Sequence, residues 1–477
     1  MQLTFYGGAG KVTGSNFLIE SGNGKIIVDC GIEQGADFCE ECVYGPFPYD
    51  AKTIAALVIT HAHLDHVGRA PKLVRDGFRG KVFMTPPTRD LAELILRDSI
   101  NILAETAREK GVAPLYEAAD VETFLALIEP LDYHVAKEVS SSLSVYLRNT
   151  GHILGSASVR ITASDGATVA LTGDIGNSPS PLLPDWEPVP DADALVMESV
   201  YGDRVHPAQQ RRTEILVEVL KRAIERGGAI LIPAFSMERT QLMLYELSNF
   251  FAAGTLPKIP VFLDSPLAIN VTEIYGKWGP TYFKPQAQDE MKREKSLFEF
   301  PFLTKTLSRE ESGKIADTPN PKIIIAGAGM SHGGRIGRHE ARYLPDPKST
   351  LIIVGYQAPG SPGRLMQEGA PSVRLPAQAG LNGQEVALRA KVEILEGWSA
   401  HADRDELLQF AEACLSAPSS AKATKGAAKL KVIFTALGEP AAERYLAQRI
   451  HDYLGARAIV PEYGQTWEVT KDSVTRV

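Results

Sequence analysis

A histidine-rich segment near the start of the chain limits its possible folds more than any other feature. The apolar run TIAALVIT leads directly into HAHLDH, and its β-branched residues predict a buried strand that ends at Thr60. The histidines lack the i, i+4 spacing of a zinc-binding helix, so a tight loop must present them. Imidazole and carboxylate groups together suit zinc, manganese or iron. The loop offers four candidate metal ligands: His61, His63, Asp65 and His66.

Short β-rich runs that end in polar, glycine-containing loops recur along the chain. Examples are GKIIVDCG, SVYLRNTGH, TVALTGDIG, ALVMESVYG, GAILIPAF and KIIIAGAGM. Helical patterns separate several of them, as at residues 212–225 and 239–251. Strands that alternate with helices predict an α/β fold, in which functional residues usually follow strand ends.

Three further polar residues follow predicted strands. Asp29 comes after IIV, His152 lies in TGHILGS, and Asp174 lies in TGDIG. Each of them alone is compatible with an ordinary turn. Together with the histidine-rich loop they supply enough ligands for two adjacent metals, and the Asp174 carboxylate could bridge them. Asp29 is better placed to orient a ligand imidazole by accepting its other N–H.

Composition limits the class of protein. A chain of 477 residues is expected to form two domains. Its net charge of −8 argues against a broadly basic surface for nucleic acid, although a local basic channel stays compatible with that sum. The chain has neither a signal-peptide pattern nor an apolar run of the roughly 18 residues that span a membrane. We therefore expect a cytoplasmic protein without membrane contact.

Two local patterns are predicted to be ordinary loops. Cys39 and Cys42 form a single CxxC without the second pair that a structural zinc site needs, which predicts a plain loop. The stretch SAPSSAKATKGAAKLK, residues 416–431, carries four lysines and no acid. A flexible solvated loop explains it better than a nucleic-acid-binding arm.

The HxHxDH loop, the strand that ends in Asp29, the downstream His152 and the TGD motif resemble the metallo-β-lactamase fold. The motifs PAFSMERTQ, LDSPLA, AGAGMSHGGRIGRH, VGYQAPGSPGRL and WSAHAD resemble its β-CASP branch. The likeness is to nucleases similar to the cleavage and polyadenylation specificity factor endonuclease and its prokaryotic relatives. It implies an α/β fold: an αββα sandwich (residues 1–199 and 391–477) with an inserted α/β β-CASP cap domain (residues 200–390).

The resemblance also assigns roles to residues. It implies that His61, His63 and His152 hold a first metal, that Asp65 and His66 hold a second, and that Asp174 bridges the two. Glu198 in MESVYG matches the acidic motif of the branch. His401 in SAHAD matches the histidine that pairs with this acid and protonates the leaving group. Without the resemblance, SAHAD is better explained as a helix start with Ser399 as its N-cap.

One position departs from the family pattern. RNA-cutting relatives end their second metal site with a histidine in VHGE, whereas this chain has ALGE, with Leu437 at the histidine position. Leucine cannot bind a metal, so the second site is expected to be weak, unless Glu439 substitutes as a ligand. DNA-cutting members of the branch resemble this chain in having an aliphatic residue there, but they lack the SAHAD histidine. The presence of His401 favours RNA.

These residues together predict a metal-dependent ribonuclease that leaves 5′-phosphate and 3′-hydroxyl ends on RNA, preferably single-stranded. The expected cofactor is one or two Zn²⁺ ions per chain, with Mn²⁺ as an alternative, and a homodimer is left open. Bound metals would activate water and neutralise charge on the phosphate, and Asp65, Glu198 and His401 would take part in catalysis. Expected substrate contacts lie between the two domains, at Arg239, Ser265, Arg335, Arg338 and Arg364. The alternatives are a DNA nuclease of the same branch and a small-molecule metallo-hydrolase of the lactamase fold.

Overall fold

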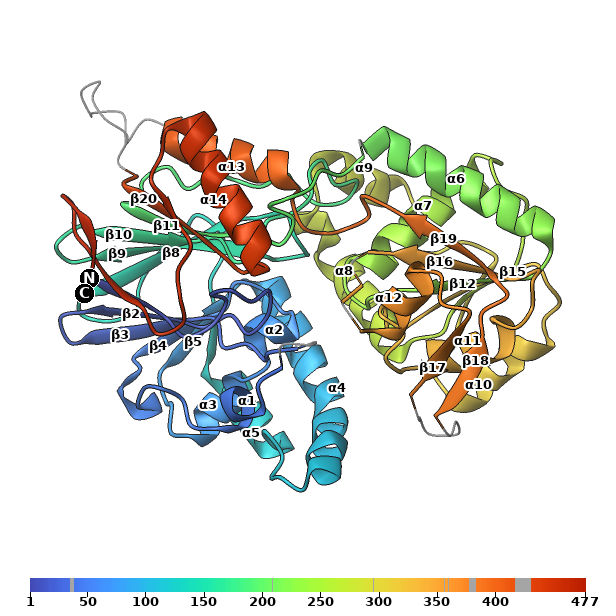
Figure 1. Ribbon diagram of the computed structural model, residues 1–477, viewed down its shortest axis with the longest axis horizontal. Helices are drawn as coiled ribbons and strands as arrows, with labels where there is room; N and C mark the ends of the chain where they lie inside the picture. The colour runs from blue at the N-terminus through green and yellow to red at the C-terminus, as the bar shows by residue number, and fades with distance from the viewer. Residues whose placement is uncertain are drawn as a thin grey trace. The chain divides into compact units, whose positions relative to one another are not determined.

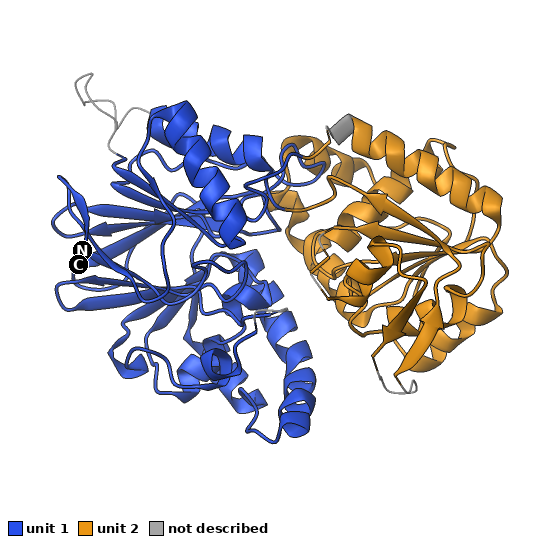
Figure 2. Ribbon diagram, viewed as in Figure 1, with its two compact units in different colours: residues 1–205, 401–477 blue, residues 206–400 orange. Residues whose placement is uncertain are grey.

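Two compact units make up the chain (Figure 2). Unit 1 consists of residues 1–205 and 401–477, and unit 2 consists of residues 206–400. In this computed structural model the described residues are 1–34, 38–207, 209–294, 296–355, 357–358, 360–376, 383–416 and 430–477. Most of the lysine-containing stretch 416–431 therefore lies outside the described residues.

Unit 1 contains two mixed sheets. The first has the strand order β23-β22-β1-β2-β3-β4-β5-β6. Its members are β1 (Gln2–Phe5), β2 (Phe17–Ser21), β3 (Gly24–Val28), β4 (Ala56–Val58), β5 (Lys81–Met84), β6 (Ile128–Pro130), β22 (Thr466–Val469) and β23 (Val474–Arg476). Strands β3 to β6 run parallel, so the loops after β3 and β4 leave from the same edge of the sheet.

The second sheet of unit 1 has the order β21-β20-β11-β10-β9-β8-β7. Its members are β7 (Ala136–Glu138), β8 (Leu143–Asn149), β9 (Ala157–Ala163), β10 (Thr168–Leu171), β11 (Ala194–Glu198), β20 (Val432–Ala436) and β21 (Ala458–Ile459). Strand β20 pairs in parallel with β11 although unit 2 separates them in sequence. The segment that returns from unit 2 is therefore an integral part of this sheet.

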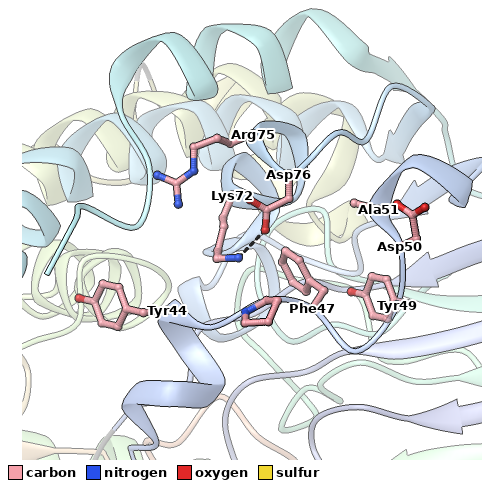
Figure 3. A pocket seen from close by; sticks show the side chains of 9 residues that line it. Tyr44, Phe47, Tyr49, Asp50, Ala51, Lys72, Arg75 and Asp76 are labelled. Carbon is pink, nitrogen blue, oxygen red and sulfur yellow. Dashed lines mark hydrogen bonds and ion pairs between the residues drawn. The ribbon is translucent and has the colours of Figure 1, made fainter.

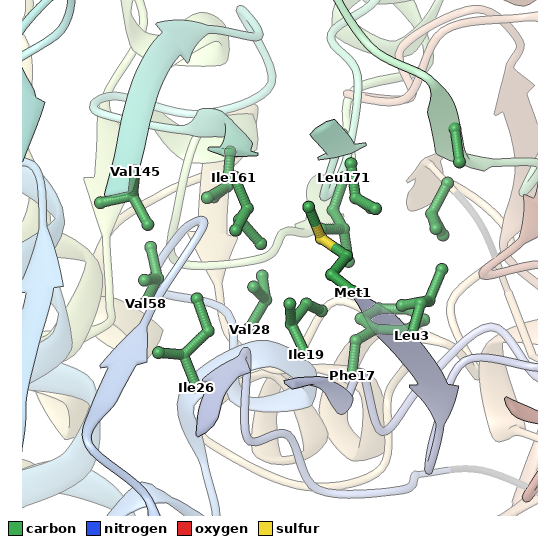
Figure 4. Packing of buried hydrophobic residues seen from close by; sticks show 14 of the residues in the cluster. Met1, Leu3, Phe17, Ile19, Ile26, Val28, Val58, Val145, Ile161 and Leu171 are labelled. Atoms are coloured by element: carbon green, nitrogen blue, oxygen red, sulfur yellow. The ribbon is translucent and has the colours of Figure 1, made fainter. Parts of the chain in front are cut away.

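Apolar side chains from both sheets meet in one core (Figure 4). Leu3, Phe17 and Val28 from the first sheet pack in the same cluster as Val145 and Leu171 from the second. Alternation along the strands produces this arrangement: β8 is buried at every second residue, as expected for a strand with only one face on the core.

Helices cover the outer faces of both sheets (Figure 1), which confirms the αββα sandwich. On the first sheet, α4 contacts β6 and α5 contacts both β5 and α3. On the second, α13 and α14 pack through Phe410 and Leu446 in a separate apolar cluster. The helices of unit 1 are α1 (Glu40–Tyr44), α2 (Leu64–Val67), α3 (Ala70–Arg75), α4 (Pro86–Lys110), α5 (Ala118–Leu127), α13 (Arg404–Ser416) and α14 (Pro440–Leu454), with a 3₁₀ turn at Ala51–Thr53.

Unit 2 is built on a parallel sheet of order β14-β13-β15-β12-β16-β19 and a hairpin, β17-β18. The strands are β12 (Ala229–Pro233), β13 (Val261–Leu263), β14 (Leu303–Lys305), β15 (Lys322–Ala326), β16 (Thr350–Val354), β17 (Ser372–Leu375), β18 (Gln384–Ala387) and β19 (Lys391–Leu395). The helices are α6 (Gln209–Arg226), α7 (Arg239–Ala252), α8 (Pro266–Tyr282), α9 (Pro285–Arg293), α10 (Arg309–Lys314), α11 (Ile336–Tyr343) and α12 (Pro362–Gln367), with a 3₁₀ turn at Ile315–Asp317. Helices α6 and α7 confirm the two predicted helical segments. Strands β12, β15 and β16 are buried at every residue, as is typical of a parallel sheet covered on both faces.

The interpretation of CxxC as a plain loop is wrong. Cys39 and Cys42 are joined by a disulfide, and the short helix α1 begins between them. The Cα atoms of the two cysteines lie 5.1 Å apart, which is within the range that a disulfide spans. Separately, among the residues that the structure describes, none of the helices is long and apolar enough to cross a bilayer.

Candidate metal centre

The predicted ligands all lie at or just beyond strand ends of unit 1. Asp29 follows β3, the histidine-rich loop follows β4, His152 follows β8 and Asp174 follows β10. Glu198 is the last residue of β11. Because β3 and β4 are parallel in one sheet and β10 and β11 in the other, the strand directions bring these distant residues together.

Three imidazoles cluster with the carboxylate of Asp174. Nε2 of His61 and Nε2 of His152 each lie 3.4 Å from Oδ2 of Asp174. Nδ1 of His63 lies 3.0 Å from Nε2 of His61 and 3.3 Å from Nε2 of His152. One donor atom from each of the four residues falls within 4.8 Å of every other. We define these four residues as the histidine side of the centre.

The other oxygen of Asp174 faces a second group. Nε2 of His66 lies 3.3 Å from Oδ1 of Asp174 and 3.9 Å from Oδ2 of Asp65. His66 is in α2, directly after the loop that carries His61 and His63. The Asp174 carboxylate therefore stands between two sets of donors, with one oxygen toward each. We define Asp65, His66 and this oxygen as the aspartate side.

Asp29 fixes the orientation of His66. Its Oδ2 lies 2.7 Å from Nδ1 of His66 and accepts hydrogen bonds from the hydroxyls of Ser15 and Thr60, both at 2.9 Å. Its Oδ1 accepts from the Thr60 backbone N–H at 2.8 Å. Ser15 and Thr60 were missed in the sequence, although the position of Thr60 immediately before the histidine-rich loop was a usable signal. A carboxylate held this way turns Nε2 of His66 toward Asp174.

The electrostatics of the centre follow from its burial. Burial, followed by the neighbouring His66, lowers the pKa of His61 well below its usual value, so its imidazole is neutral. Burial alone would also lower the pKa of His66, but Asp174 and Asp29 raise it well above its usual value. Burial alone would raise the pKa of Asp174, but His66 and His61 lower it well below its usual value. Without a bound cation, the centre thus holds an ionised Asp174 carboxylate whose charge is balanced by a protonated His66.

The donor set fits a divalent cation. Neutral imidazole and carboxylate are the ligands of zinc and related metals. Nε2 of His66 is buried, and its 3.3 Å contact with Oδ1 of Asp174 does not have hydrogen-bond geometry, although buried polar atoms normally have a hydrogen-bond partner. A cation on the aspartate side would supply that partner and balance the charge of Asp174.

A second cluster adjoins the same carboxylate. Nδ1 of His401 lies 3.2 Å from Oε2 of Glu198 and 3.9 Å from Oδ2 of Asp174. Glu198 is fully buried, and it accepts a short hydrogen bond from the Ile175 backbone N–H. Burial raises the pKa of Glu198, and His401 opposes that effect. The structure therefore brings together the acid and the histidine that are 203 residues apart in the chain.

The SAHAD segment does not begin a helix at Ser399. Helix α13 starts at Arg404, where Oδ1 of Asp403 accepts hydrogen bonds from the backbone N–H groups of Asp405 and Glu406. His401 instead forms an isolated β-bridge with Gly176, beside Asp174. The N-cap interpretation is wrong because Asp403 competes better for the cap, with Glu406 bonding back to its N–H.

Leu437 lies in the apolar core. Its side chain is 1% exposed and belongs to the cluster between the two sheets of unit 1. A Cβ on Gly8 would come within 2.5 Å of Leu437 Cδ2, so Gly8 packs directly on it. The φ angle of Leu437 is 51°, in the left-handed region that a leucine rarely adopts. Glu439, the alternative ligand, is exposed and occupies the N-cap position of α14.

The residues predicted to contact substrate lie in unit 2, and for most of them the structure shows a local role. Arg239 is the first residue of α7 and is buried. The Ser265 hydroxyl caps α8 by accepting from the Ala268 N–H. Arg364 pairs with Glu368 at 2.6 Å, and Arg338 lies in α11. Contact with RNA stays a prediction for these four residues.

Arg335 takes part in a buried network at the end of β13. Its Nη1 lies 2.7 Å from Oδ1 of Asp264, and the same carboxylate pairs with His339 and accepts from Thr306 and Ser312. Burial alone would raise the pKa of Asp264, but these partners lower it below its usual value. The network positions Arg335 firmly, and its contact with RNA also stays a prediction.

A cavity of about 410 Å³ lies apart from the predicted ligands, between α3 and residues 44–51 (Figure 3). Tyr44, Phe47 and Tyr49 supply its aromatic walls. Its charged residues are balanced within the lining, since Lys72 is paired with Asp76. None of the predicted metal or substrate residues lines it, so it does not contribute to the centre.

Comparison with known families gives three matches in chain order. Residues 9–78 match the metallo-beta-lactamase superfamily, residues 240–366 match the Beta-Casp domain, and residues 385–461 match a Zn-dependent metallo-hydrolase RNA specificity domain. Together they cover more than half of the chain, on both units.

Comparison with individual proteins agrees. The chain is 37% identical to a protein named Ribonuclease TTHA0252 from Thermus thermophilus, over 86% of this chain and 90% of that protein. It is 31% identical to an RNase J-like protein of Methanocaldococcus jannaschii, over 86% and 88%. It is 32% identical to the transcription termination factor FttA of Methanosarcina mazei, but spans only 64% of its length. A crystal structure of an Enterococcus faecalis protein of unknown function shares the fold, with a TM-score of 0.54 at 12% identity and coverage of 98% and 99%.

These matches confirm the resemblance drawn from the sequence motifs. The matched segments include the histidine-rich loop, the LDSPLA and GAGMSHGG motifs, and the segment around His401. The chain belongs to the β-CASP family of the metallo-β-lactamase superfamily.

Proposed function

We propose that this protein is a metal-dependent ribonuclease that hydrolyses phosphodiester bonds of RNA, preferably single-stranded. The observation that carries the proposal is the position of His401, which faces both the buried Glu198 and Asp174, a carboxylate of the metal centre. A hydrolase of small molecules would need the metals, but its reaction would not require the pair of His401 and Glu198. Ribonuclease names among the relatives point the same way.

For the metal centre we propose two divalent cations, preferably Zn²⁺ with Mn²⁺ as an alternative. The histidine side would hold the first through His61, His63 and His152. The aspartate side would hold the second through Asp65 and His66, with Asp174 shared. Metals at such a site supply Lewis acidity that makes water a better nucleophile and neutralises charge on the phosphate. We take unit 2 as the cap domain of the family, and cytoplasmic location and dimerisation stay predictions.

The role of His401 follows from which nitrogen faces the acid. Nδ1 points toward Glu198, so Nδ1–H donates to that carboxylate and Nε2 is left to carry the second proton. A 3′-oxygen leaves a phosphodiester poorly unless it is protonated, and Nε2–H of His401 would give it that proton. The products would carry a 5′-phosphate and a 3′-hydroxyl.

The test compares wild type with His401→Ala on matched single-stranded RNA and DNA oligomers. We expect wild type to cleave RNA faster than DNA. We expect the variant to retain its metal content and fold but to cleave about 10²–10⁴-fold more slowly, the usual contribution of general acid–base catalysis. His451→Ala is a suitable control, because His451 is an exposed histidine on α14.

Undiminished RNA cleavage by His401→Ala would exclude His401 as the acid. Preferential cleavage of DNA would favour the alternative in which Leu437 marks a DNA nuclease. If the protein cleaves neither RNA nor DNA but hydrolyses small esters or lactones, the alternative of a small-molecule metallo-hydrolase would be supported.

A further inference from the structure

A second group of potential metal ligands lies outside the centre: Glu33 and Cys39 lie between β3 and α1, and Cys42 lies within α1. One donor atom from each of Glu33, Cys39 and Cys42 lies within 4.8 Å of the other two. All three residues are half-buried. In this structure the two sulfurs are bonded to each other, so they are not free to bind a metal.

We propose that Cys39 and Cys42 form a reversible dithiol–disulfide pair whose reduced form, with Glu33, binds a soft divalent cation such as Zn²⁺. Nothing in the proposed ribonuclease mechanism uses these residues. The inference therefore does not depend on that function.

The disulfide is poorly suited to a purely structural role. It joins residues only three apart in sequence, and in the chain-entropy model a disulfide stabilises less as the loop that it closes becomes shorter. Partly exposed disulfides are also the more easily reduced ones. In a reducing compartment, most disulfides that do form are transient and redox-active. A labile bond fits these conditions better than a permanent cross-link.

Glu33 is already directed at the pair. Its Oε2 accepts a hydrogen bond from the Cys39 backbone N–H at 3.2 Å and from Nζ of Lys11 at 2.9 Å. The Glu33 side chain is only 12% exposed, so the surrounding residues restrict its movement. In the oxidised form the Lys11 ammonium balances the charge of Glu33. In the reduced form a cation held by two thiolates could take the place of that ammonium.

The remaining cysteines cannot substitute for this pair. Cys30 and Cys414 are buried, so their thiols are not exposed to a reductant or to a metal in solution. Thiolates, not thiols, attack disulfides and bind metals. Among the four cysteines, reactivity is therefore confined to Cys39 and Cys42.

The redox step is balanced by an external dithiol. One thiolate of the reductant attacks a sulfur of the Cys39–Cys42 bond, and the other cysteine sulfur leaves as a thiolate. The second thiolate of the reductant then attacks the mixed disulfide and releases the first cysteine. The reductant becomes a cyclic disulfide, two electrons pass to the protein, and the two cysteine sulfurs take up two protons. Cation binding releases those protons again.

Two thiolates and one carboxylate give three protein ligands. Three protein ligands leave a fourth position for water in the tetrahedral geometry that zinc prefers. Thiolate ligands select zinc and other soft cations over magnesium and calcium. The site would therefore differ in preference from one made of carboxylates alone.

The segment also contacts the metal centre through the backbone. Cys30 N–H donates to the His66 carbonyl at 2.7 Å, and Ile32 N–H donates to the Leu64 carbonyl at 2.9 Å. The two backbones approach so closely that a Cβ on Gly31 would come within 1.6 Å of the Asp65 carbonyl oxygen. Glu33 thus follows directly after a stretch that is fixed against the histidine-rich loop, which holds one ligand of the new site in place.

The experiment uses Co²⁺ as the probe and does not measure cleavage. Full-length protein purified without reductant is expected to gain two mass units on treatment with a dithiol. After removal of the reductant, Co²⁺ is expected to produce a thiolate-to-cobalt charge-transfer band in the reduced protein only. The metal centre of unit 1 has no described thiol ligand and cannot produce that band. Reduced protein should also bind one more equivalent of Co²⁺ than oxidised protein.

Three variants locate the site. Cys39→Ser should lose the mass change, the band and the extra equivalent, while Cys414→Ser should retain all three. Glu33→Gln should retain the mass change and bind Co²⁺ more weakly. No mass change on reduction would show that the disulfide is not a state of this protein. A reduced protein without the band, or a band that persists in Cys39→Ser, would equally overturn the proposal.

Discussion

The two sides of Asp174 differ in the number of imidazole groups that could bind a metal. On the histidine side, Nε2 of His61 and Nε2 of His152 face Oδ2, and His63 lies against both of these imidazoles. On the aspartate side, Nε2 of His66 lies 3.3 Å from Oδ1 of Asp174 and 3.9 Å from Oδ2 of Asp65. The position at which the family resemblance implies another histidine is Leu437, which packs into the core. A single carboxylate thus joins a group with three imidazoles to one with a single imidazole.

The difference shows that backbone position and side-chain chemistry are separate requirements for a metal site. The turn at Leu437 retains a φ of 51°, a conformation in which histidine, asparagine and aspartate are several-fold enriched. Its N–H is also fixed, because it donates to the Gly8 carbonyl at 2.6 Å. The backbone there suits a polar residue, but the side chain is hydrocarbon. We therefore expect the two sides to bind metal with different affinities.

The largest effect is expected from His61→Ala, which removes one of the three imidazoles of the histidine side. Loss of an outer partner that merely orients a ligand typically costs about 10–100-fold in metal affinity or activity, and loss of a ligand itself should cost more. We expect most of the bound metal to be lost and cleavage to fall by more than about 100-fold. Elemental analysis and an RNA cleavage assay measure both quantities. Retention of full metal content would show that the histidine side is not the principal binding site.

The next effect is expected from Asp29→Asn, which should weaken the aspartate side selectively. Asp29 holds His66 through Nδ1, so the neutral amide would hold that imidazole less firmly. A loss of about 10–100-fold in the affinity of the second metal is expected, while the first metal stays bound. A chelator titration followed by elemental analysis resolves the two ions. Asp50→Asn is the control, since Asp50 is an exposed N-cap residue of a 3₁₀ turn. Equal weakening of both metals would remove the distinction between the sides.

The features that the sequence predicted share a cause. The histidine-rich loop and Asp174 follow short apolar runs that predict strands. Because the ends of parallel strands lie at one edge of a sheet, the place of each ligand just after a strand was enough to predict that it belongs to the site. The pairing of His401 with Glu198 was available only through the resemblance. It depends on how the returning segment enters the second sheet, where β20 pairs with β11, and no local pattern encodes that pairing.

Other features could not be predicted from local patterns for a different physical reason. Ser15 and Thr60 act through hydroxyl hydrogen bonds to Asp29, and such residues are common in any loop. The Cys39–Cys42 bond depends on a turn geometry that two residues of spacing permit but do not require. The direction of the Leu437 side chain depends on Gly8 and the core between the sheets, which are distant in sequence.

A smaller effect is expected from Leu437→His, which should make the two sides more alike. The left-handed backbone there accepts histidine more readily than leucine, and an added imidazole should tighten the second metal by at least about tenfold, the low end of ligand-partner effects. Less added Zn²⁺ or Mn²⁺ should then be needed for full cleavage. Leu437→Asn is the matched control, because asparagine also tolerates this φ but supplies no imidazole. Two metals bound with equal, tight affinity in wild type would show that the aspartate side is already complete.

The smallest effect on cleavage is expected from Glu443→Gln, which tests the packing behind Leu437. Glu443 lies in the first turn of α14, and its Oε1 accepts from the Gly10 N–H at 3.0 Å, so it holds the loop that packs on Leu437. Burial raises the pKa of Glu443 from an ordinary 4.5 to about 8. A carboxyl with a raised pKa contributes stability that is fully present below about pH 4.5 and is lost as the pH rises through about 8.

Between those limits wild type should lose about 1.4 kcal/mol of unfolding free energy per pH unit relative to the variant. The glutamine amide keeps an oxygen acceptor for Gly10 and does not ionise. Denaturant unfolding of both proteins at pH 6, 7 and 8 measures the difference in their unfolding free energies. The titration of all other groups is common to both proteins and cancels in this difference. Parallel stability profiles would show that Glu443 is ionised in the folded protein throughout. The loop against Leu437 would then be held by an ionised carboxylate at every pH in this range.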